Sequence, residues 1–246
     1  MSVLDELRFF AATGKAGELF EIPIASEDSE LDRLYLIGVG DRSLSGLRTA
    51  GAALGKKVRG KALSVISLCA VTSDEIKAHG VSLALGAYQW NVKTDKAQEV
   101  PQLALATTET KSVQIAATIS EALYTARDLI LTPSNIKNPL WMATEAKKIA
   151  EHKGLEISVL AGKELARFGG LRAVGQSSPK PGPRFIEVTY TPKGKARSAA
   201  ALPHVVIVGK GITFDTGGIS LKRPYEYMTA MKSEDRKSTR LNSSHT

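Results

Sequence analysis

The sequence has a single cysteine and no long apolar run, and each of these absences excludes a class of protein. One cysteine among 246 residues cannot form an intrachain disulfide, which excludes a disulfide-stapled secreted domain. Cys69, within LSVISLCAV, is most simply a small core residue. No stretch approaches the roughly 18 apolar residues of a membrane-spanning helix. The N-terminus, MSVLDELRFFAATGKAG, has early acidic residues and no apolar segment typical of a secretory signal, so we expect a cytoplasmic location and no membrane partner.

The charge is positive but not concentrated. There are 33 Lys and Arg against 25 Asp and Glu, a formal net charge of +8. The densest basic cluster is LGKKVRGK at residues 54–61, and the few aromatic residues do not alternate with the basic ones. Scattered charge of this kind is typical of a solvated surface rather than of a nucleic-acid groove. We therefore do not expect nucleic acid as the main partner.

Strand-like and helix-like segments alternate along the chain. This order predicts an α/β fold with a mostly parallel sheet covered by helices. Caps support several helices, for example Ser43 or Ser45 as an N-cap, and Pro139 at the start and Gly154 at the end of another. The strands are expected at 18–24, 33–40, 62–71 (buried), 100–107, 155–161, 184–192 and 205–208, and the helices at 43–58, 73–90, 112–131, 139–154 and 163–170.

The best domain boundary follows the long helix at 112–131. That helix has apolar residues at the i, i+3, i+4 spacing, and it stops at TPSNIKNP, residues 132–139. Two prolines and two asparagines in eight residues break regular structure. The β-α alternation then begins again. The sequence therefore predicts one α/β unit before the break, a connecting helix, and a second α/β unit after it.

The segment VGKGITFDTGGISLKRPYEYMTAMKSE, residues 208–234, carries the candidate chemistry. The apolar strand VVIV leads into Lys210, Asp215, a Gly-Gly pair and Lys222, and the carboxyl ends of strands are where open α/β sheets place ligands. Three interpretations compete. Lys210 and Asp215 could form a structural ion pair. A phosphate loop is disfavoured, because the Gly-x-x-x-x-Gly-Lys order is missing. In a metal site, Asp215 would supply oxygens, and the amine of Lys210 would ligate only with a depressed pKa.

Several stretches resemble the leucyl aminopeptidase (cytosol aminopeptidase) family of metallopeptidases. GKGITFDTGGISLK resembles the family signature, with the spacing of Lys210, Asp215 and Lys222 preserved. ARDLILTPSNIKNP, GGLRAVGQSSPKPGPRFIEVTYTP and HGVSLALGAYQW are also similar to family segments. The resemblance implies an N-terminal macro-like α/β domain at 1–125, which includes the start of the connecting helix, and the first part of an α/β catalytic domain at 126–234.

The resemblance also implies a role for each matched residue. Asp215 would be shared by two divalent ions, manganese or zinc, which activate a water molecule. Lys210 would bind the second ion and help to hold the α-amino group of a peptide substrate. Lys222 would stay cationic and polarise the scissile carbonyl. Met231 would line the first specificity pocket. The implied reaction is removal of N-terminal residues, often leucine, by a homohexamer.

The chain departs from the family pattern at two places. Glu234 stands where the family has a further metal-binding aspartate, and it is a tentative ligand here. The later Asn-Thr-Asp-Ala-Glu-Gly-Arg block, which supplies two more carboxylates and the catalytic arginine, is missing from the sequence. We therefore expect no competent dinuclear site in the chain as written. The alternatives are a DNA-binding regulatory role, which the family also has, and an inactive structural paralogue.

Residues 235–246, here called the tail, do not resemble the family. DRKSTRLNSSH, residues 235–245, is identical to the translation of a common short-read sequencing adapter. The adapter is normally preceded by an A, so a gene broken after the first two bases of an aspartate codon would yield glutamate. The sequence therefore predicts that the tail is an artefact. It also predicts that only the first two bases of the Glu234 codon belong to the gene.

Overall fold

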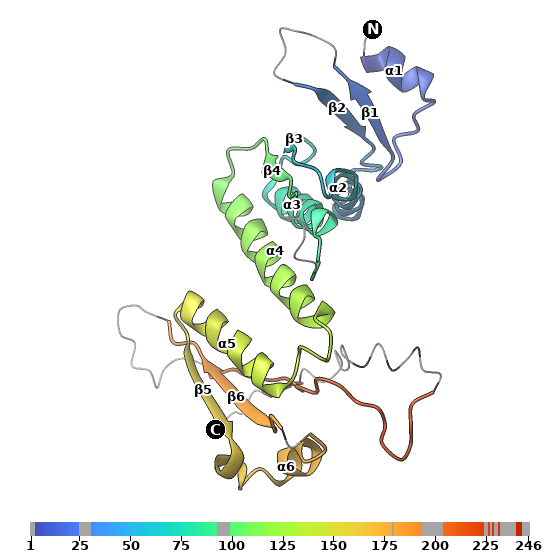
Figure 1. Ribbon diagram of the computed structural model, residues 1–246. Helices are drawn as coiled ribbons and strands as arrows, with labels where there is room; N and C mark the ends of the chain where they lie inside the picture. Colours follow the sequence, from blue (N-terminus) through green and yellow to red (C-terminus); the bar gives the residue numbers. More distant parts are fainter. Residues whose placement is uncertain are drawn as a thin grey trace. The chain divides into compact units, whose positions relative to one another are not determined.

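The computed structural model (Figure 1) describes residues 3–24, 31–92, 99–178, 180–192, 204–223, 226, 228, 231 and 240–242. The chain forms two compact units, Met1–Asp128 and Leu129–Thr246. The division falls inside the long helix α4 (Thr110–Leu131), the helix predicted to connect two α/β units. Each unit combines helices with paired strands, which confirms the α/β class. No described helix is long and apolar enough to cross a membrane.

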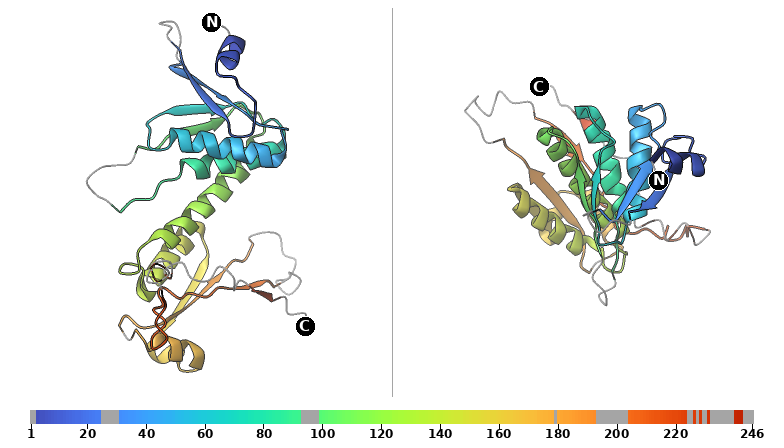
Figure 2. Two further views of the ribbon diagram at one scale, coloured as in Figure 1. Left: turned by 90° about the vertical axis from the view of Figure 1, so that its right-hand side faces the viewer. Right: turned by 90° about the horizontal axis from the view of Figure 1, so that it is seen from above.

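The described residues of the first unit form two pairs of strands and three helices of 15 residues or more, the last of them, α4, ending beyond it. Figures 1 and 2 show how these elements are arranged. Strands β1 (Leu19–Pro23) and β2 (Arg33–Ile37) are antiparallel, with Leu19 opposite Ile37. Strands β3 (Ser64–Ser67) and β4 (Gln102–Leu105) are parallel, with Ser64 opposite Gln102. The remaining elements are α1 (Val3–Phe9), α2 (Leu44–Val58), α3 (Ser73–Ala87) and α4. The predicted β-α-β alternation is thus present as β3-α3-β4.

The core of the first unit lies between α2, α3 and the strands. Its buried residues come from three elements, and partly buried side chains from β1, β2 and β4 pack against them. Helix α2 is N-capped by Ser43, whose hydroxyl accepts the Gly46 N–H at 3.2 Å. The buried members of this cluster are Leu54, Val58, Val65 and Leu83.

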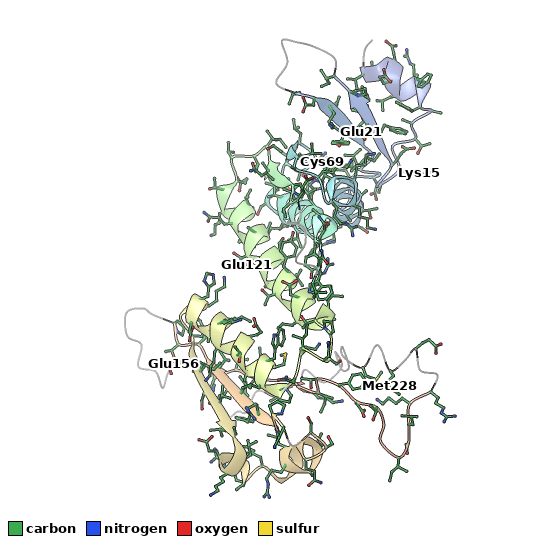
Figure 3. All side chains as sticks on the ribbon, in the orientation of Figure 1. Lys15, Glu21, Cys69, Glu121, Glu156 and Met228 are labelled. Carbon is green, nitrogen blue, oxygen red and sulfur yellow. The ribbon has the colours of Figure 1, made fainter. Side chains whose placement is uncertain are left out.

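The predicted burial of the strand at 62–71 is confirmed for one face of the strand and is wrong for the other. Val65 and Ser67 are buried, whereas Ile66 is 63% and Leu68 75% exposed. Successive side chains of a strand point to opposite faces, and the helices cover one face of β3 among the described residues. Cys69, at the end of this segment, is half-buried rather than in the core (Figure 3).

Surface charge in the first unit is paired between elements. The carboxylate of Glu21 on β1 (Figure 3) forms ion pairs with Arg33, whose Nη1 lies 2.8 Å from Oε1, and with Lys57, whose Nζ lies 2.8 Å from Oε2. The hydrogen bond from Lys57, with that from Arg33, lowers the pKa of Glu21 to about 2, and partial desolvation opposes this. Part of the basic cluster at 54–61 is therefore used in holding α2 to the β1–β2 hairpin.

A capping box begins α3, and it gives a first prediction. The Thr72 hydroxyl accepts the Glu75 N–H at 3.4 Å, and the Glu75 carboxylate accepts the Thr72 N–H at 3.0 Å. Thr72→Ala removes one of these acceptors, so we expect the free energy of unfolding of the first unit to fall by about 1 kcal/mol. Urea unfolding followed by Trp90 fluorescence in a Trp141→Phe background measures it. Thr72→Ser keeps the acceptor and should restore most of the loss; equal losses in both variants would contradict the prediction.

The second unit holds the remaining helices and strands. Helix α5 (Pro139–Lys153) packs against the antiparallel pair β5 (Glu156–Ala161) and β6 (Arg184–Thr189). The side-chain oxygen of Asn138 caps α5 by accepting the Trp141 N–H at 3.0 Å. At the other end, Gly154 terminates the helix in the left-handed conformation, with φ +66°, as a glycine at this position predicts. Between β5 and β6 lie a 3-10 turn (Gly162–Leu165) and α6 (Gly169–Gly175).

Strand β7 (Val206–Val208) leads directly to the candidate site. It pairs antiparallel with β8 (Arg240–Asn242), which lies within the tail, and Val206 is opposite Asn242. Every residue of β7 is exposed, although all are apolar. Such composition is typical of strands covered on both faces. Of the four described strand pairs, β3–β4 is parallel and the other three are antiparallel.

Candidate functional site

The candidate site is the loop that follows β7, residues 209–223. It folds by two overlapping turns: the Ser220 N–H donates to Gly217 O at 3.1 Å, and the Lys222 N–H donates to Thr216 O at 3.0 Å. Gly217 has φ +86°, and a Cβ there would lie 2.2 Å from Ser220 O. This glycine is therefore required by the turn itself. The consequence is that the chain reverses direction between Asp215 and Lys222.

The reversal places Lys222, the second lysine of the signature, beside Asp215. Lys222 Nζ lies 2.8 Å from Asp215 Oδ2, and the Gly217 N–H donates to Asp215 Oδ1 at 2.8 Å. Both carboxylate oxygens therefore accept a hydrogen bond. Lys222 Nζ also lies 3.1 Å from Met231 Sδ. Three of the predicted site residues, Asp215, Lys222 and Met231, are thus in one place.

Asp215 is held in its charged form. The hydrogen bond from Lys222 is the largest cause, the Gly217 N–H adds to it, and the charges of Lys222 and Lys210 add further, so the pKa of this carboxyl lies below its usual 3.8 although some desolvation opposes the shift. The side chain of Asp215 is 43% exposed, so solvent screens these charges. A deprotonated carboxylate at neutral pH is the form that can ligate a cation.

The structure corrects one interpretation of the loop and leaves another prediction outside the described residues. The hydrogen-bonded ion pair of Asp215 is with Lys222, whereas the sequence suggested Lys210 as the structural partner. Lys210 is exposed and acts on Asp215 through its charge. Glu234, the tentative ligand in the place of an aspartate, lies outside the described residues. The closure of Lys222 onto Asp215 was missed, and the Thr-Gly-Gly turn between them was the signal that could have indicated it.

The donor chemistry of the loop suits a divalent cation, but the number of donors does not. Zinc takes about four ligands and manganese about six, mostly oxygen or nitrogen. Asp215 offers carboxylate oxygens, and the amine of Lys210 would be one further donor. Among the residues that the structure describes, no group of three or more His, Cys, Asp or Glu side chains could hold a metal ion. The described loop therefore does not fit a complete metal centre by itself.

The fold is that of an α/β protein. Its candidate site is a glycine-containing turn that carries lysine and aspartate side chains and follows the carboxyl end of a strand, which is where α/β enzymes bind ligands. Residues 124–236 match the model of the cytosol aminopeptidase family, catalytic domain. The probable cytosol aminopeptidase of Aquifex aeolicus (strain VF5) is 34% identical over 233 residues, covering 89% of this chain and 45% of the relative. That of Mycobacterium marinum is 31% identical over 241 residues, covering 91% and 46%.

Solved structures agree with these matches. The bottromycin maturation enzyme BotP in complex with Mn superposes with a TM-score of 0.77 at 26% identity, covering 95% of this chain and 50% of that one. The cytosol aminopeptidase from Coxiella burnetii has a TM-score of 0.73 at 21% identity, which shows the fold, and covers 95% and 48%. The chain belongs to the cytosol aminopeptidase family, a family of metallo-aminopeptidases, and spans about half the length of the curated relatives it matches.

Proposed function

We propose that the protein to which this chain belongs is a leucyl-type aminopeptidase that removes N-terminal residues from peptides with two divalent metal ions, manganese or zinc. The observation that carries the proposal is the loop after β7, in which the Lys210, Asp215 and Lys222 of the family signature occur within a matched catalytic domain. The manganese complex of BotP supports metal use by a related fold. A cytoplasmic homohexamer is the assembly that the family resemblance suggests.

Each signature residue of this chain would have a distinct role in the proposed reaction. Asp215, kept deprotonated by its surroundings, would be a metal ligand, with the amine of Lys210 as a second donor that also holds the substrate's α-amino group. When bound, the metal ions would supply an activated water molecule. Lys222 would act as a cation toward the scissile carbonyl. Met231, beside Lys222, would line the pocket for the first substrate side chain. Glu234 stays a tentative ligand.

A chimera tests the function. Residues 1–231 are joined to the part of the Aquifex aeolicus relative that begins at the residue aligned with Lys232, so that no aligned position is lost and the relative's own residue stands in the place of Glu234. The family resemblance implies that this part supplies the donors that the described loop lacks. We expect hydrolysis of leucine p-nitroanilide that depends on added manganese or zinc. Asp215→Asn should abolish it, and Lys222→Met should lower kcat at least about 100-fold, because an electrostatic stabiliser is removed. A folded, metal-loaded chimera without turnover would instead support an inactive paralogue.

The 246-residue chain alone should behave differently. The described loop offers one carboxylate and one amine to a metal, so we expect no turnover of leucine p-nitroanilide with either metal, at any concentration up to about 1 mM. The full-length Aquifex aeolicus relative serves as the active control in the same assay. Metal-dependent turnover by the 246-residue chain would overturn this expectation and would mean that other residues complete the site.

We further propose that the tail is not encoded by the gene. The support is the identity of residues 235–245 to a translated sequencing adapter, and the family match extends to residue 236, close to the point where the resemblance stops. Resequencing of the source transcript is expected to give an aspartate codon after Met-Lys-Ser and a continuing family sequence. Genomic DNA that encodes EDRKSTRLNSSH in frame would refute the proposal.

A further inference from the structure

Helix α4 buries small residues and exposes large apolar ones. The buried residues of this helix are Ser112, Ala116 and Ser120. Three larger apolar residues have the same spacing of four: Ile115 is 40%, Ile119 41% and Leu123 39% exposed. These three are here called the α4 stripe. A helix at the surface of a domain usually turns its large apolar residues toward the core. In α4 this pattern is reversed.

The small residues of α4 are explained by its contact with α3. A Cβ on Gly80 of α3 would lie 3.4 Å from Ala116 Cβ, so the two helices approach closely there. The hydroxyl oxygen of Ser112 lies 2.8 Å from that of Ser73, and the Ser120 hydroxyl donates to Ala116 O at 2.7 Å. Close approach favours small residues, and both serine hydroxyls have a partner. The contact with α3 therefore accounts for the buried face of α4 but not for the α4 stripe.

We propose that the α4 stripe is a self-association surface, which packs antiparallel against the α4 stripe of a second copy of the chain, whether or not the complete protein is a peptidase. Apolar side chains that gather on one exposed face are typical of interaction sites. Residues four apart form a ridge on a helix, and two such ridges fit into each other's grooves in the commonest class of helix packing. A shallow depression runs beside Ile115 and Ile119 and offers such a groove. A surface that meets its own copy about a two-fold axis closes at a dimer.

The charges beside the α4 stripe favour a second copy in the antiparallel orientation. Lys111 lies one turn before Ile115, whereas Glu121 (Figure 3) lies toward the other end of the helix, and both are exposed. When Ile115 of one copy faces Ile119 of the other, the antiparallel direction brings Lys111 within one turn of Glu121 of the second copy. The symmetry forms this ion pair twice. A parallel pair would instead place like charges side by side and align the two helix dipoles.

The surface is small, so the association should be weak. A stable dimer buries roughly 1,200–2,000 Å² of surface, which is more than one exposed helix face provides. We therefore expect the 246-residue chain to dimerise with a dissociation constant of about 100 µM. Sedimentation equilibrium between about 5 and 500 µM protein measures this constant, because the dimer dominates only at the upper end of that range. A chain that stays monomeric up to about 500 µM would overturn the proposal.

Ile119→Glu tests whether the α4 stripe is the surface in contact. It places two carboxylates near the two-fold axis, so we expect the dissociation constant to rise at least about ten-fold. Ile66→Glu on β3 is the matched control, since Ile66 is also an exposed apolar residue of the first unit, and it should change the constant by less than a factor of about two. Equal weakening by both substitutions, or weakening by Ile66→Glu alone, would contradict the assignment of the surface.

Reversal of the two charges tests the antiparallel orientation. Lys111→Glu and Glu121→Lys should each raise the dissociation constant at least about three-fold, because each leaves like charges facing each other twice in the dimer. The variant with both substitutions restores opposite charges, and its constant should return to within a factor of about two of the original. If the double variant is weaker than either single one, the proposed pairing is wrong. Circular dichroism checks that each variant is folded.

The chimera distinguishes a second copy from the rest of the protein as the partner of the α4 stripe. Ile119→Glu should lower the mass of the chimera's assembly in sedimentation at the same protein concentration. An assembly of unchanged mass would mean that the remainder of the protein covers the stripe, and it would overturn the proposal. Hydrolysis of leucine p-nitroanilide by the chimera is a separate measurement, so loss of the proposed function and loss of the proposed contact are distinguishable.

Discussion

Replacing Gly55 by alanine is expected to lower the free energy of unfolding of the first unit by about 2–3 kcal/mol. The reason is that α2 and α3 contact each other backbone to backbone. A Cβ on Gly55 would lie 2.2 Å from Leu83 O, and one on Gly86 would lie 2.6 Å from Ala52 O. Carbonyl oxygens cannot rotate away as a side chain can, so one helix has to move. The gain in helix propensity, up to about 1 kcal/mol, is too small to compensate.

Gly80→Ala in α3 is the matched control for Gly55→Ala. A Cβ at position 80 would meet Leu105 Cδ1 at 3.1 Å, the end of a flexible side chain, and Ala116 Cβ at 3.4 Å. We therefore expect a change within about 1 kcal/mol. Urea unfolding of the 246-residue chain, followed by Trp90 fluorescence with Trp141→Phe, gives both values. Similar small changes in the two variants would show that α2 and α3 are not in such close contact.

Acidification from pH 7.5 to pH 5 is expected to destabilise the first unit through His79. This residue is fully buried, with Nε2 2.9 Å from Ser67 Oγ and Nδ1 3.1 Å from Leu47 O. A carbonyl only accepts, so Nδ1 donates to Leu47, and Nε2 accepts the Ser67 hydroxyl. The neutral ring thus satisfies both partners and joins α3 to β3 and α2. Truncation by His79→Ala should cost about 3 kcal/mol, because it removes two buried hydrogen bonds and leaves a cavity where the ring was.

The direction of the pH effect follows from the pKa of His79. Burial lowers this pKa below the usual 6.5, and the hydrogen bond to Leu47 offsets part of the shift. The unfolded chain therefore binds a proton more readily than the folded one below pH 6.5. The stability that the neutral ring contributes is complete above pH 6.5 and is lost as the pH falls toward the lowered folded pKa. Glu21 and Glu75, with pKa values of about 2, lose their contribution only below about pH 4.5.

A series of urea midpoints between pH 5 and pH 7.5 tests this dependence. His79→Gln should flatten the slope, because the amide does not titrate in this range. His152 lies at the exposed end of α5, so His152→Gln should leave the pH dependence of the urea midpoint, as followed by Trp90 fluorescence, unchanged. If His79→Gln retains the full slope, another group is responsible for the acid sensitivity.

Local rules predicted the elements well because they act over a few residues. The N-cap at Ser43, the proline at the start of α5 and the glycine at its end, Gly154, are confirmed. The burial of the segment at 62–71 was not predictable in the same way. Its apolar residues fit a strand buried on both faces, but exposure is decided by whether other elements cover each face, and Ile66 remains exposed.

The sequence by itself determined the α/β class, the order of the longer helices and of most strands, and the loop of Lys210, Asp215 and Lys222, since each is a matter of periodicity, capping residues or spacing. It missed α1, α6 and β8. The tertiary structure decided what these residues contact. It placed Gly55 against Leu83, His79 between Ser67 and Leu47, and Lys222 rather than Lys210 on Asp215. The first two contacts join segments that are distant in the chain, and the third depends on a turn whose path is fixed only when its hydrogen bonds form. The first two contacts arise from packing between distant segments, which one-dimensional patterns do not specify.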